Sequence, residues 1–130
     1  HALLVHGLDG VDEISTIGPT RISELRDGEV RTYEVSPEDF GLPRAHQRDL
    51  FGGEPAESAE VLLRAISGEA CHAREIVALN AGGAIYVGGM AASIAEGVEV
   101  AQRTIDSGAA VETLHSLREM SLALAGARAE

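Results

Sequence analysis

Three carboxylates stand close together near the start of the sequence, on a segment that glycines interrupt. Residues 6–13 read His-Gly-Leu-Asp-Gly-Val-Asp-Glu, so that Asp9, Asp12 and Glu13 follow the short apolar run of residues 2–5. Hard cations such as Mg²⁺ bind oxygen ligands and keep several waters, and one or two carboxylates plus a substrate diphosphate are enough to hold them. Because ligands of α/β sheets bind beyond the carboxyl ends of strands, this segment has the composition and the position of a cation-binding loop.

Each side chain of this segment also has a plain structural interpretation. Asp12 and Glu13 could be the solvated acids of a loop that leads into a helix. Asp9 stands beside Gly10 and is expected to shape the turn rather than to bind metal, because Asp side chains readily hydrogen-bond nearby backbone. His6 could orient the loop or contact a phosphate, but an ordinary packed histidine is at least as good an interpretation, and His6 is left out of the site.

The charge balance narrows the classes of partner. The 130 residues carry 21 acidic and 10 basic side chains, a net charge of −11, and every one of the bases is an arginine. An acidic chain of this kind repels phosphate backbones, so we expect no nucleic-acid partner. The absence of lysine excludes a P-loop phosphate lysine and Schiff-base chemistry from this stretch.

Composition indicates a globular protein, with 45% apolar and 24% charged residues. Cys71 is the single cysteine, which excludes a disulfide framework and a cysteine-based zinc site within the chain.

The most apolar stretch, residues 76–92, is interrupted by Asn80 and four glycines. It therefore favours a buried helix over a membrane span, which needs about 20 apolar residues. No signal-peptide pattern is visible, so we expect a cytoplasmic protein with no membrane partner.

The elements that must position the acidic loop begin with strands. The unbroken apolar run of residues 2–5 predicts a strand that is covered on both faces in a parallel sheet. Residues 20–25 and 29–35 are also β-prone, and the Asp-Gly pair between them is a strong signal for a hairpin turn. The loop is thus expected to lie between a buried strand and a hairpin.

The remainder of the chain is predicted to be helical. Residues 36–39 read Ser-Pro-Glu-Asp, an N-cap followed by a helix-starting proline and a first-turn acid pair. Apolar residues then recur with helical spacing in four segments, residues 59–66, 74–88, 94–105 and 111–120. The second segment is apolar on nearly all sides, as in a helix buried within the fold. Asn80 within it is expected to hydrogen-bond neighbouring backbone.

The predicted elements do not provide enough neighbouring strands to pair both edges of the strand at residues 2–5. A parallel strand needs parallel neighbours, and a hairpin plus four helices cannot pair both edges of residues 2–5. The expected fold class is therefore α/β, with one buried parallel strand, a β-hairpin and about four helices. Residues 1–130 are expected to form the C-terminal segment of this α/β domain, with its N-terminal half outside the chain.

The order of motifs along the chain resembles the C-terminal part of the anthranilate phosphoribosyltransferase family. The family signature His-Gly-x-Asp-Gly-Leu-Asp-Glu corresponds to residues 6–13, where Val11 replaces leucine. Further matches follow in the expected order over nearly the whole chain, at Glu24-Leu25, Asp27-Gly28, residues 37–42, Gly52-Gly53, Leu79-Asn80-Ala81, Glu96-Gly97 and residues 105–108. The departures are mild: residues 58–59 read Ser-Ala where the family has Asn-Ala, and residues 82–83 are glycines where it tends to alanines.

This resemblance implies a nucleoside phosphorylase/phosphoribosyltransferase-type α/β domain. It implies transfer of phosphoribose from 5-phosphoribosyl 1-diphosphate to anthranilate, with release of diphosphate, in tryptophan biosynthesis. It also implies Mg²⁺ as the cofactor and Asp12 and Glu13 as its ligands. An acidic loop that faces an anionic substrate would repel it without the cation, so the electrostatics also require the metal.

The resemblance leaves the rest of the machinery outside this chain. In the family, the diphosphate loop and the residues that contact anthranilate lie in the N-terminal half. No catalytic residue is therefore assigned within residues 1–130, and the substrate-binding residues stay unknown. The resemblance further implies a homodimer for the full-length enzyme and an isolated chain without activity.

Two other functions are weighed against this one. A related pyrimidine nucleoside phosphorylase-type enzyme shares the fold, but phosphorolysis in those relatives does not use the Asp-Glu metal pair. A non-catalytic binding module, such as the nucleic-acid-binding relatives of the family, needs a basic surface, which the net charge of −11 opposes.

Two weaker candidate sites have structural interpretations. Gly52 and Gly53 precede a predicted helix and could cradle a phosphate there, but Glu54 and Glu57 beside them oppose an anion. Cys71 and the scattered histidines lack the spacing of metal ligands or of a nucleophile with its base. Neither group is therefore expected to form a site.

Overall fold

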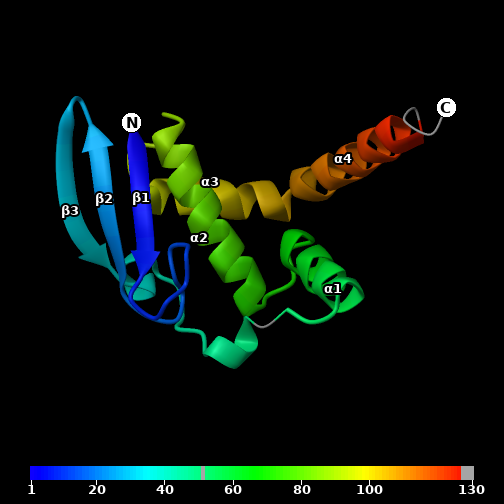
Figure 1. The fold of residues 1–130 in the computed structure, drawn as a ribbon, viewed down its shortest axis with the longest axis horizontal. Coiled ribbons are helices and arrows are strands. Elements are labelled where there is room, and N and C mark those ends of the chain that lie inside the picture. The colour runs from blue at the N-terminus through cyan, green and yellow to red at the C-terminus, as the bar shows by residue number, and fades with distance from the viewer. Residues whose placement is uncertain (51, 127–130) are drawn as a thin grey trace.

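The computed structural model describes residues 1–50 and 52–126, and places a small sheet beside a group of helices (Figure 1). The sheet has three strands, hydrogen-bonded in chain order, and both pairs are antiparallel. They are β1 (Ala2–Gly7), β2 (Thr20–Arg26) and β3 (Glu29–Val35). The α/β class, with a first strand, a hairpin and four α-helices, is thus confirmed.

The hairpin closes at the Asp-Gly pair that the sequence indicates. Asp27 and Gly28 both have positive φ angles, of 52° and 84°. A type I′ turn needs two such left-handed residues, and its twist matches the twist of the flanking strands. This turn fixes the register in which Leu25 lies opposite Val30.

The one described neighbour of β1 is antiparallel, whereas the parallel neighbours expected for it lie outside this chain. β1 runs antiparallel to β2, with Val5 opposite Ile22, and its residues alternate between exposed and half-buried until Gly7. Leu4 is 75% exposed, so this strand is not covered on both faces by the described residues. The physical reason is the connection: residues 8–19 form a compact loop that turns the chain back beside β1, and such a reversal gives antiparallel neighbours.

Beyond β3, the described residues form two short 3₁₀ helices and four α-helices, which confirms the four segments predicted from helical spacing. They are η1 (Pro37–Phe40), η2 (Gln47–Asp49), α1 (Pro55–Ile66), α2 (His72–Val87), α3 (Ile94–Asp106) and α4 (Ala109–Gly126). The predicted start at residues 36–39 is present, where the Ser36 backbone N–H donates to Asp39 Oδ2 at 2.7 Å. At the start of α3, Ser93 Oγ accepts from the Glu96 N–H at 3.1 Å, a regular N-cap.

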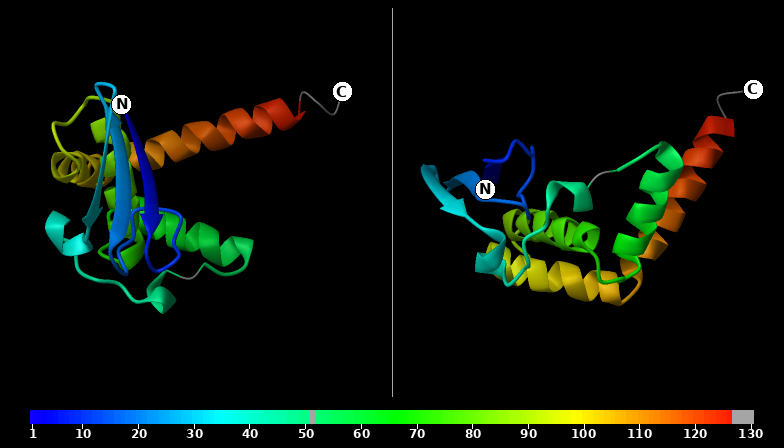
Figure 2. Two further views of the ribbon diagram at one scale, coloured as in Figure 1. Left: turned by 60° about the vertical axis from the view of Figure 1, so that its left-hand side comes forward. Right: turned by 90° about the horizontal axis from the view of Figure 1, so that it is seen from below.

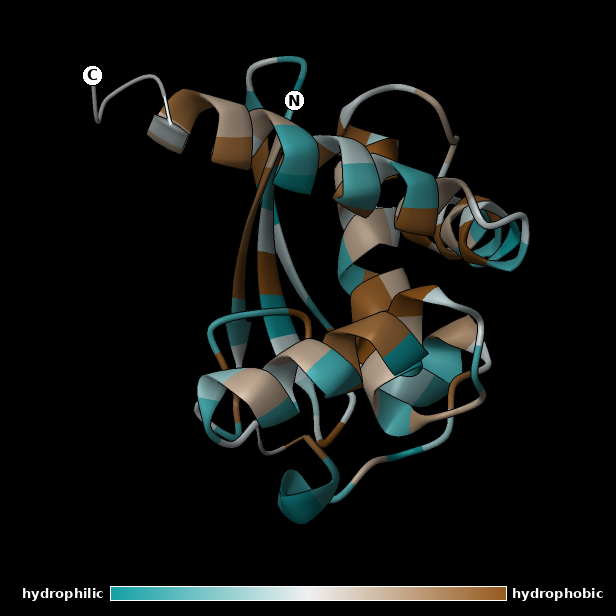
Figure 3. Cartoon of the chain, turned by 90° about the vertical axis from the view of Figure 1, so that its right-hand side faces the viewer, coloured by the Kyte–Doolittle hydropathy of each residue, from teal (hydrophilic) through white to brown (hydrophobic). Residues whose placement is uncertain are grey.

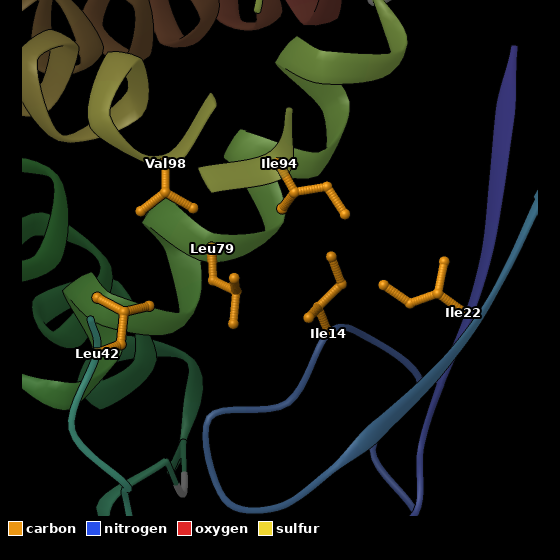
Figure 4. Close-up of a cluster of buried hydrophobic side chains, with 6 residues drawn as sticks. All are labelled: Ile14, Ile22, Leu42, Leu79, Ile94 and Val98. Atoms are coloured by element: carbon orange, nitrogen blue, oxygen red, sulfur yellow. The ribbon is translucent and has the colours of Figure 1, made fainter. Parts of the chain in front are cut away.

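The main core lies between the sheet, the loop after β1, and helices α2 and α3. Six buried side chains meet there (Figure 4): Ile14, Ile22, Leu42, Leu79, Ile94 and Val98. Ile14 follows the acidic loop directly, and it is only 3% exposed. The position of the acidic loop is therefore coupled to the packing of the core.

Helices α2 and α3 approach each other closely through glycine. A Cβ built on Gly82 would lie 2.6 Å from the backbone nitrogen of Val98, and one built on Gly97 would overlap the carbonyl oxygen of Gly82. Real Cβ atoms do not come so near to backbone, so neither position accepts a side chain without a shift of one helix. α2 is buried along this side at Ala78, Leu79, Gly82 and Gly83, as the apolar pattern predicted.

Helix α4 extends away from the sheet, as the two views of Figure 2 show. It has no buried residue. Leu117, Met120 and Leu124 are each more than 60% exposed, and Figure 3 shows hydrophobic and hydrophilic residues mixed along the helix. Among the described helices, none combines the length and apolar character that crossing a membrane requires.

Candidate functional site

The acidic loop begins where β1 ends, at the same end of the sheet as the start of β2 (Figure 1). Its first turn is closed by backbone hydrogen bonds. The Gly7 N–H donates to the Val11 carbonyl oxygen at 2.8 Å, and the Gly10 N–H donates to the Gly7 carbonyl oxygen at 2.9 Å. Leu8 N–H donates across the loop to the Pro19 carbonyl oxygen at 2.9 Å. The backbone that carries the carboxylates is therefore held at its beginning.

Asp9 points into the loop and is held there. Its Oδ2 accepts a hydrogen bond from Ser15 Oγ at 2.5 Å, and its Oδ1 accepts from the Val11 N–H at 3.1 Å. A Cβ on Gly7 would lie 2.6 Å from Asp9 Oδ1, so glycine is needed at position 7 for this arrangement. The expectation that Asp9 shapes the turn is confirmed.

The far end of the loop is held by a side chain from α2. Asn80 Oδ1 accepts from the Ile14 N–H at 2.8 Å, and Asn80 Nδ2 donates to the Ile14 carbonyl oxygen at 3.0 Å. Nδ2 also donates to the carbonyl oxygen of Ile76, one turn earlier on α2, at 3.0 Å. The expected hydrogen bonding of Asn80 to neighbouring backbone is thus confirmed, although its partner Ile14, 66 residues away, could not be identified from the sequence.

Asp12 and Glu13 lie between these two anchored points. Both residues are exposed. Within the described part of the chain neither carboxylate has a hydrogen bond or an ion pair, in contrast to Asp9. Two carboxylates are thus presented to solvent on a backbone that is fixed on either side, so their oxygens are accessible to a cation.

The protein side of such a site supplies few ligands. Among residues 1–50 and 52–126, no group of three or more His, Cys, Asp or Glu side chains is placed to hold a metal ion by itself. Mg²⁺ does not need one, because it commonly binds one or two carboxylates and completes its shell with waters and substrate phosphates. The chemistry of Asp12 and Glu13 therefore suits a magnesium ion shared with a phosphorylated ligand better than a closed structural metal site.

A second polar cluster joins the hairpin to α2, and no sequence signal indicated it. Glu24 on β2 accepts hydrogen bonds from Tyr33 on β3 at 2.9 Å and from Tyr86 on α2 at 2.6 Å. Burial, and then the bond to Glu24, raise the pKa of Tyr33 to about 12. Arg26 donates to Tyr86 Oη at 3.0 Å. These contacts lie away from the acidic loop, and they fix the sheet against the helix that carries Asn80.

The weaker candidate at Gly52 and Gly53 is closed by side chains of its own helix. At the start of α1 the Gly53 N–H donates to Ser58 Oγ at 3.2 Å, and the Glu54 N–H donates to Glu57 Oε2 at 3.0 Å. The helix start is thus occupied by its own side chains rather than open to an anion, as expected. Cys71 is a free cysteine at the start of α2.

Comparison with known proteins gives the chain its family. Residues 1–111 match the model of a family described as "Glycosyl transferase family, a/b domain". The anthranilate phosphoribosyltransferase of Parvibaculum lavamentivorans is 49% identical over 116 residues, which are 89% of this chain and 34% of that protein. The resemblance stated from the sequence is thereby confirmed. The chain spans about a third of the length of the curated relatives it matches.

Solved structures agree with this assignment. The anthranilate phosphoribosyltransferase of Thermus thermophilus is 37% identical, with a TM-score of 0.79 over 88% of this chain and 34% of that one. The enzyme of Saccharomyces cerevisiae in complex with PRPP and Mg has a TM-score of 0.77 over 87% of this chain and 33% of that one, and at 24% identity it shows the fold alone. Since the family match spans residues 1–111, the chain belongs to this glycosyl transferase family.

Proposed function

We propose that this chain provides the magnesium-binding loop of an anthranilate phosphoribosyltransferase. The reaction transfers phosphoribose from PRPP (5-phosphoribosyl 1-diphosphate) to the amine of anthranilate and releases diphosphate, a step of tryptophan biosynthesis. The observation that carries the proposal is the exposed, unpartnered pair Asp12 and Glu13 on a loop that is fixed at both ends. It is supported by 49% identity to a relative that bears this name.

The two carboxylates fit the group they are proposed to hold. Carboxylate oxygen is the protein ligand that Mg²⁺ prefers, and two such ligands leave room for waters and diphosphate oxygens. No arginine forms an ion pair with Asp12 or Glu13 within the described residues, so their charge is available to a cation. When bound, Mg²⁺ supplies the positive charge that neutralises the diphosphate as it leaves.

The chain's own residues then have two tasks. Asp12 and Glu13 would hold the cation at the end of β1, while Asp9 and Asn80 keep the backbone of that loop in place. The acidic loop also provides an anionic environment, which favours positive charge that develops on the ribose during transfer. The groups that bind PRPP and anthranilate are proposed to come from the rest of the α/β domain.

The proposal also covers the place of this chain in the full-length enzyme. Residues 1–130 act as the C-terminal segment of the phosphoribosyltransferase α/β domain, in keeping with their coverage of 34% of a relative's length. The full-length enzyme is a cytoplasmic homodimer, and the isolated segment is inactive because the remaining substrate-binding residues are missing.

The test replaces the two carboxylates by their neutral amides in the protein that the complete gene encodes. Asp12→Asn with Glu13→Gln should sharply reduce Mg²⁺-dependent consumption of anthranilate in the presence of PRPP, because the cation loses both protein ligands. The matched control is Glu112→Gln with Glu119→Gln, which removes the same charge from exposed positions on α4. The control should retain activity.

Two results would count against the proposal. Equal activity of the loop variant and the control across a Mg²⁺ titration would remove Asp12 and Glu13 from the mechanism. Phosphorolysis of a pyrimidine nucleoside by the parent protein, without turnover of anthranilate, would favour the nucleoside phosphorylase alternative. Each substrate pair is therefore assayed with the same preparation.

A further inference from the structure

Asn80 makes an unusual set of contacts for a residue inside a helix. Its carboxamide forms a two-bond ring with the backbone of Ile14, accepting from the N–H at 2.8 Å and donating to the carbonyl oxygen at 3.0 Å. The second hydrogen of Nδ2 is donated to Ile76 on the same helix at 3.0 Å. Both donor hydrogens are therefore in use, and one of them fixes the carboxamide relative to α2.

These two hydrogen bonds have the pattern that a residue of one β-strand makes with the backbone of a neighbouring antiparallel strand. A carboxamide carries the same donor and acceptor as a peptide group, so it can satisfy both polar groups of a residue that has no strand beside it. Ile14 needs such a partner, because its side chain is only 3% exposed while its backbone lies in an irregular loop. An unpaired backbone group at this depth is costly.

The position of Ile14 gives the contact its significance. Ile14 follows Glu13 directly, and the carboxylates of Asp12 and Glu13 have no bond within the described residues that could place them. Their location is set by the backbone alone. That backbone is held on one side by the bonds of Asp9 to Ser15 and Val11, and on the other by Asn80.

We propose that Asn80 is a positioning residue for the magnesium loop. Through Ile14 it sets the distance of the Asp12–Glu13 backbone from α2, and it thereby preorganises the two carboxylates for the cation. This inference rests on the proposed function, since it assigns to a residue of α2 a task in the same metal site. Groups that orient metal ligands from outside the coordination shell change metal affinity by about 10–100-fold when they are removed.

The test uses Asn80→Asp, which keeps the shape of the side chain. The aspartate can still accept from the Ile14 N–H, but it has no hydrogen to donate to the carbonyl oxygens of Ile14 and Ile76. Asn80→Ala is the second variant, used where the aspartate does not yield folded protein. Ile105→Ala is the control, because Ile105 is a core residue, 4% exposed, of a separate cluster that does not contain Ile14.

The first readout requires no metal. ¹⁵N relaxation of the protein from the complete gene, recorded without Mg²⁺, should give Asp12 and Glu13 order parameters near those of rigid backbone, about 0.85, and values below about 0.6 in the Asn80 variants. Ile105→Ala should lower the melting temperature and leave these two order parameters unchanged. Unchanged order at Asp12 and Glu13 in the Asn80 variants overturns the inference, as does equal loss of order in the Ile105 control.

The second readout is the Mg²⁺ activation constant of the protein from the complete gene, assayed with PRPP and anthranilate. The Asn80 variants should need at least about tenfold more Mg²⁺ for half-maximal activity, and Ile105→Ala should match the parent. An unchanged activation constant overturns the role of Asn80 and leaves the metal site intact. A parent protein without transferase activity overturns the proposed function, while the relaxation result still decides whether Asn80 orders the loop.

Discussion

Two kinds of carboxylate stand on the same short loop, and their environments separate their roles. Asp9 uses both oxygens within the loop, on Ser15 Oγ and on the Val11 N–H. Asp12 and Glu13, three and four residues later, are exposed. A carboxylate with a full set of internal hydrogen bonds stabilises the loop, and one without them is free to bind a cation. The geometry of the loop thus assigns the structural task to Asp9.

This division predicts that two similar substitutions change the free energy of unfolding by different amounts. Asp9→Ala leaves buried Ser15 without its acceptor and should lower the free energy of unfolding by about 1–3 kcal/mol. Asp12→Ala removes an exposed side chain with no internal bond and should change it by less than about 0.5 kcal/mol. Urea denaturation of both variants measures the difference. Equal losses would mean that Asp9 does not hold the loop.

The sequence was sufficient to find the candidate ligands but not what holds them. Asp12 and Glu13 are recognisable because they form one continuous motif of residues 6–13. Asn80 was predicted to hydrogen-bond neighbouring backbone, and one such bond is to Ile76 on the same helix. Its bond to Ile14 spans 66 residues, and no local pattern can reveal a partner at that separation before the fold is known.

At the level of elements, local signals were reliable and pairing was not. The Asp-Gly turn of the hairpin and the helical periodicities were correct because propensity and spacing act within a few residues. The antiparallel pairing of β1 with β2 was not predicted, because an unbroken apolar run indicates burial but not the direction of the neighbouring strand. The parallel neighbours expected outside this chain stay a prediction. Leu4, at 75% exposure, shows that part of this run has no cover within the described residues.

The contact of α2 with α3 offers a test at this scale. Gly97→Ala places a methyl group against the carbonyl oxygen of Gly82, and backbone cannot move aside as a flexible side chain can. The variant should lose about 1–3 kcal/mol of stability in thermal or urea unfolding. Gly126→Ala on α4 is the control, because no atom of the described residues lies within 4 Å of the added methyl group. A stable Gly97→Ala protein would contradict the close approach of the two helices.

The whole molecule combines a buried core with an open edge of the sheet at β1. The core couples the loop, the sheet and two helices through Ile14, Ile22 and Leu79. The outer edge of β1, by contrast, has no strand beside it among residues 1–50 and 52–126. An open edge with exposed apolar side chains is a template for pairing with another strand.

The protein of residues 1–130 should therefore self-associate. Light scattering over a range of concentrations should show a rising average mass, because β1 presents unpaired backbone and exposed Leu4. Leu4→Lys should reduce this association, since a charged side chain on an edge strand opposes pairing. A monodisperse monomer at all concentrations would contradict the prediction.

The junction of the hairpin with α2 has a practical consequence for optical spectroscopy. The chain has no tryptophan and two tyrosines, Tyr33 and Tyr86, and both donate to the carboxylate of Glu24. Its tyrosine absorbance, its tyrosine fluorescence and the tyrosine band of its near-ultraviolet circular dichroism therefore originate at a single point of the structure. These two tyrosines report on the junction between the sheet and α2. Separation of the sheet from α2 should therefore change the tyrosine signals without any added dye.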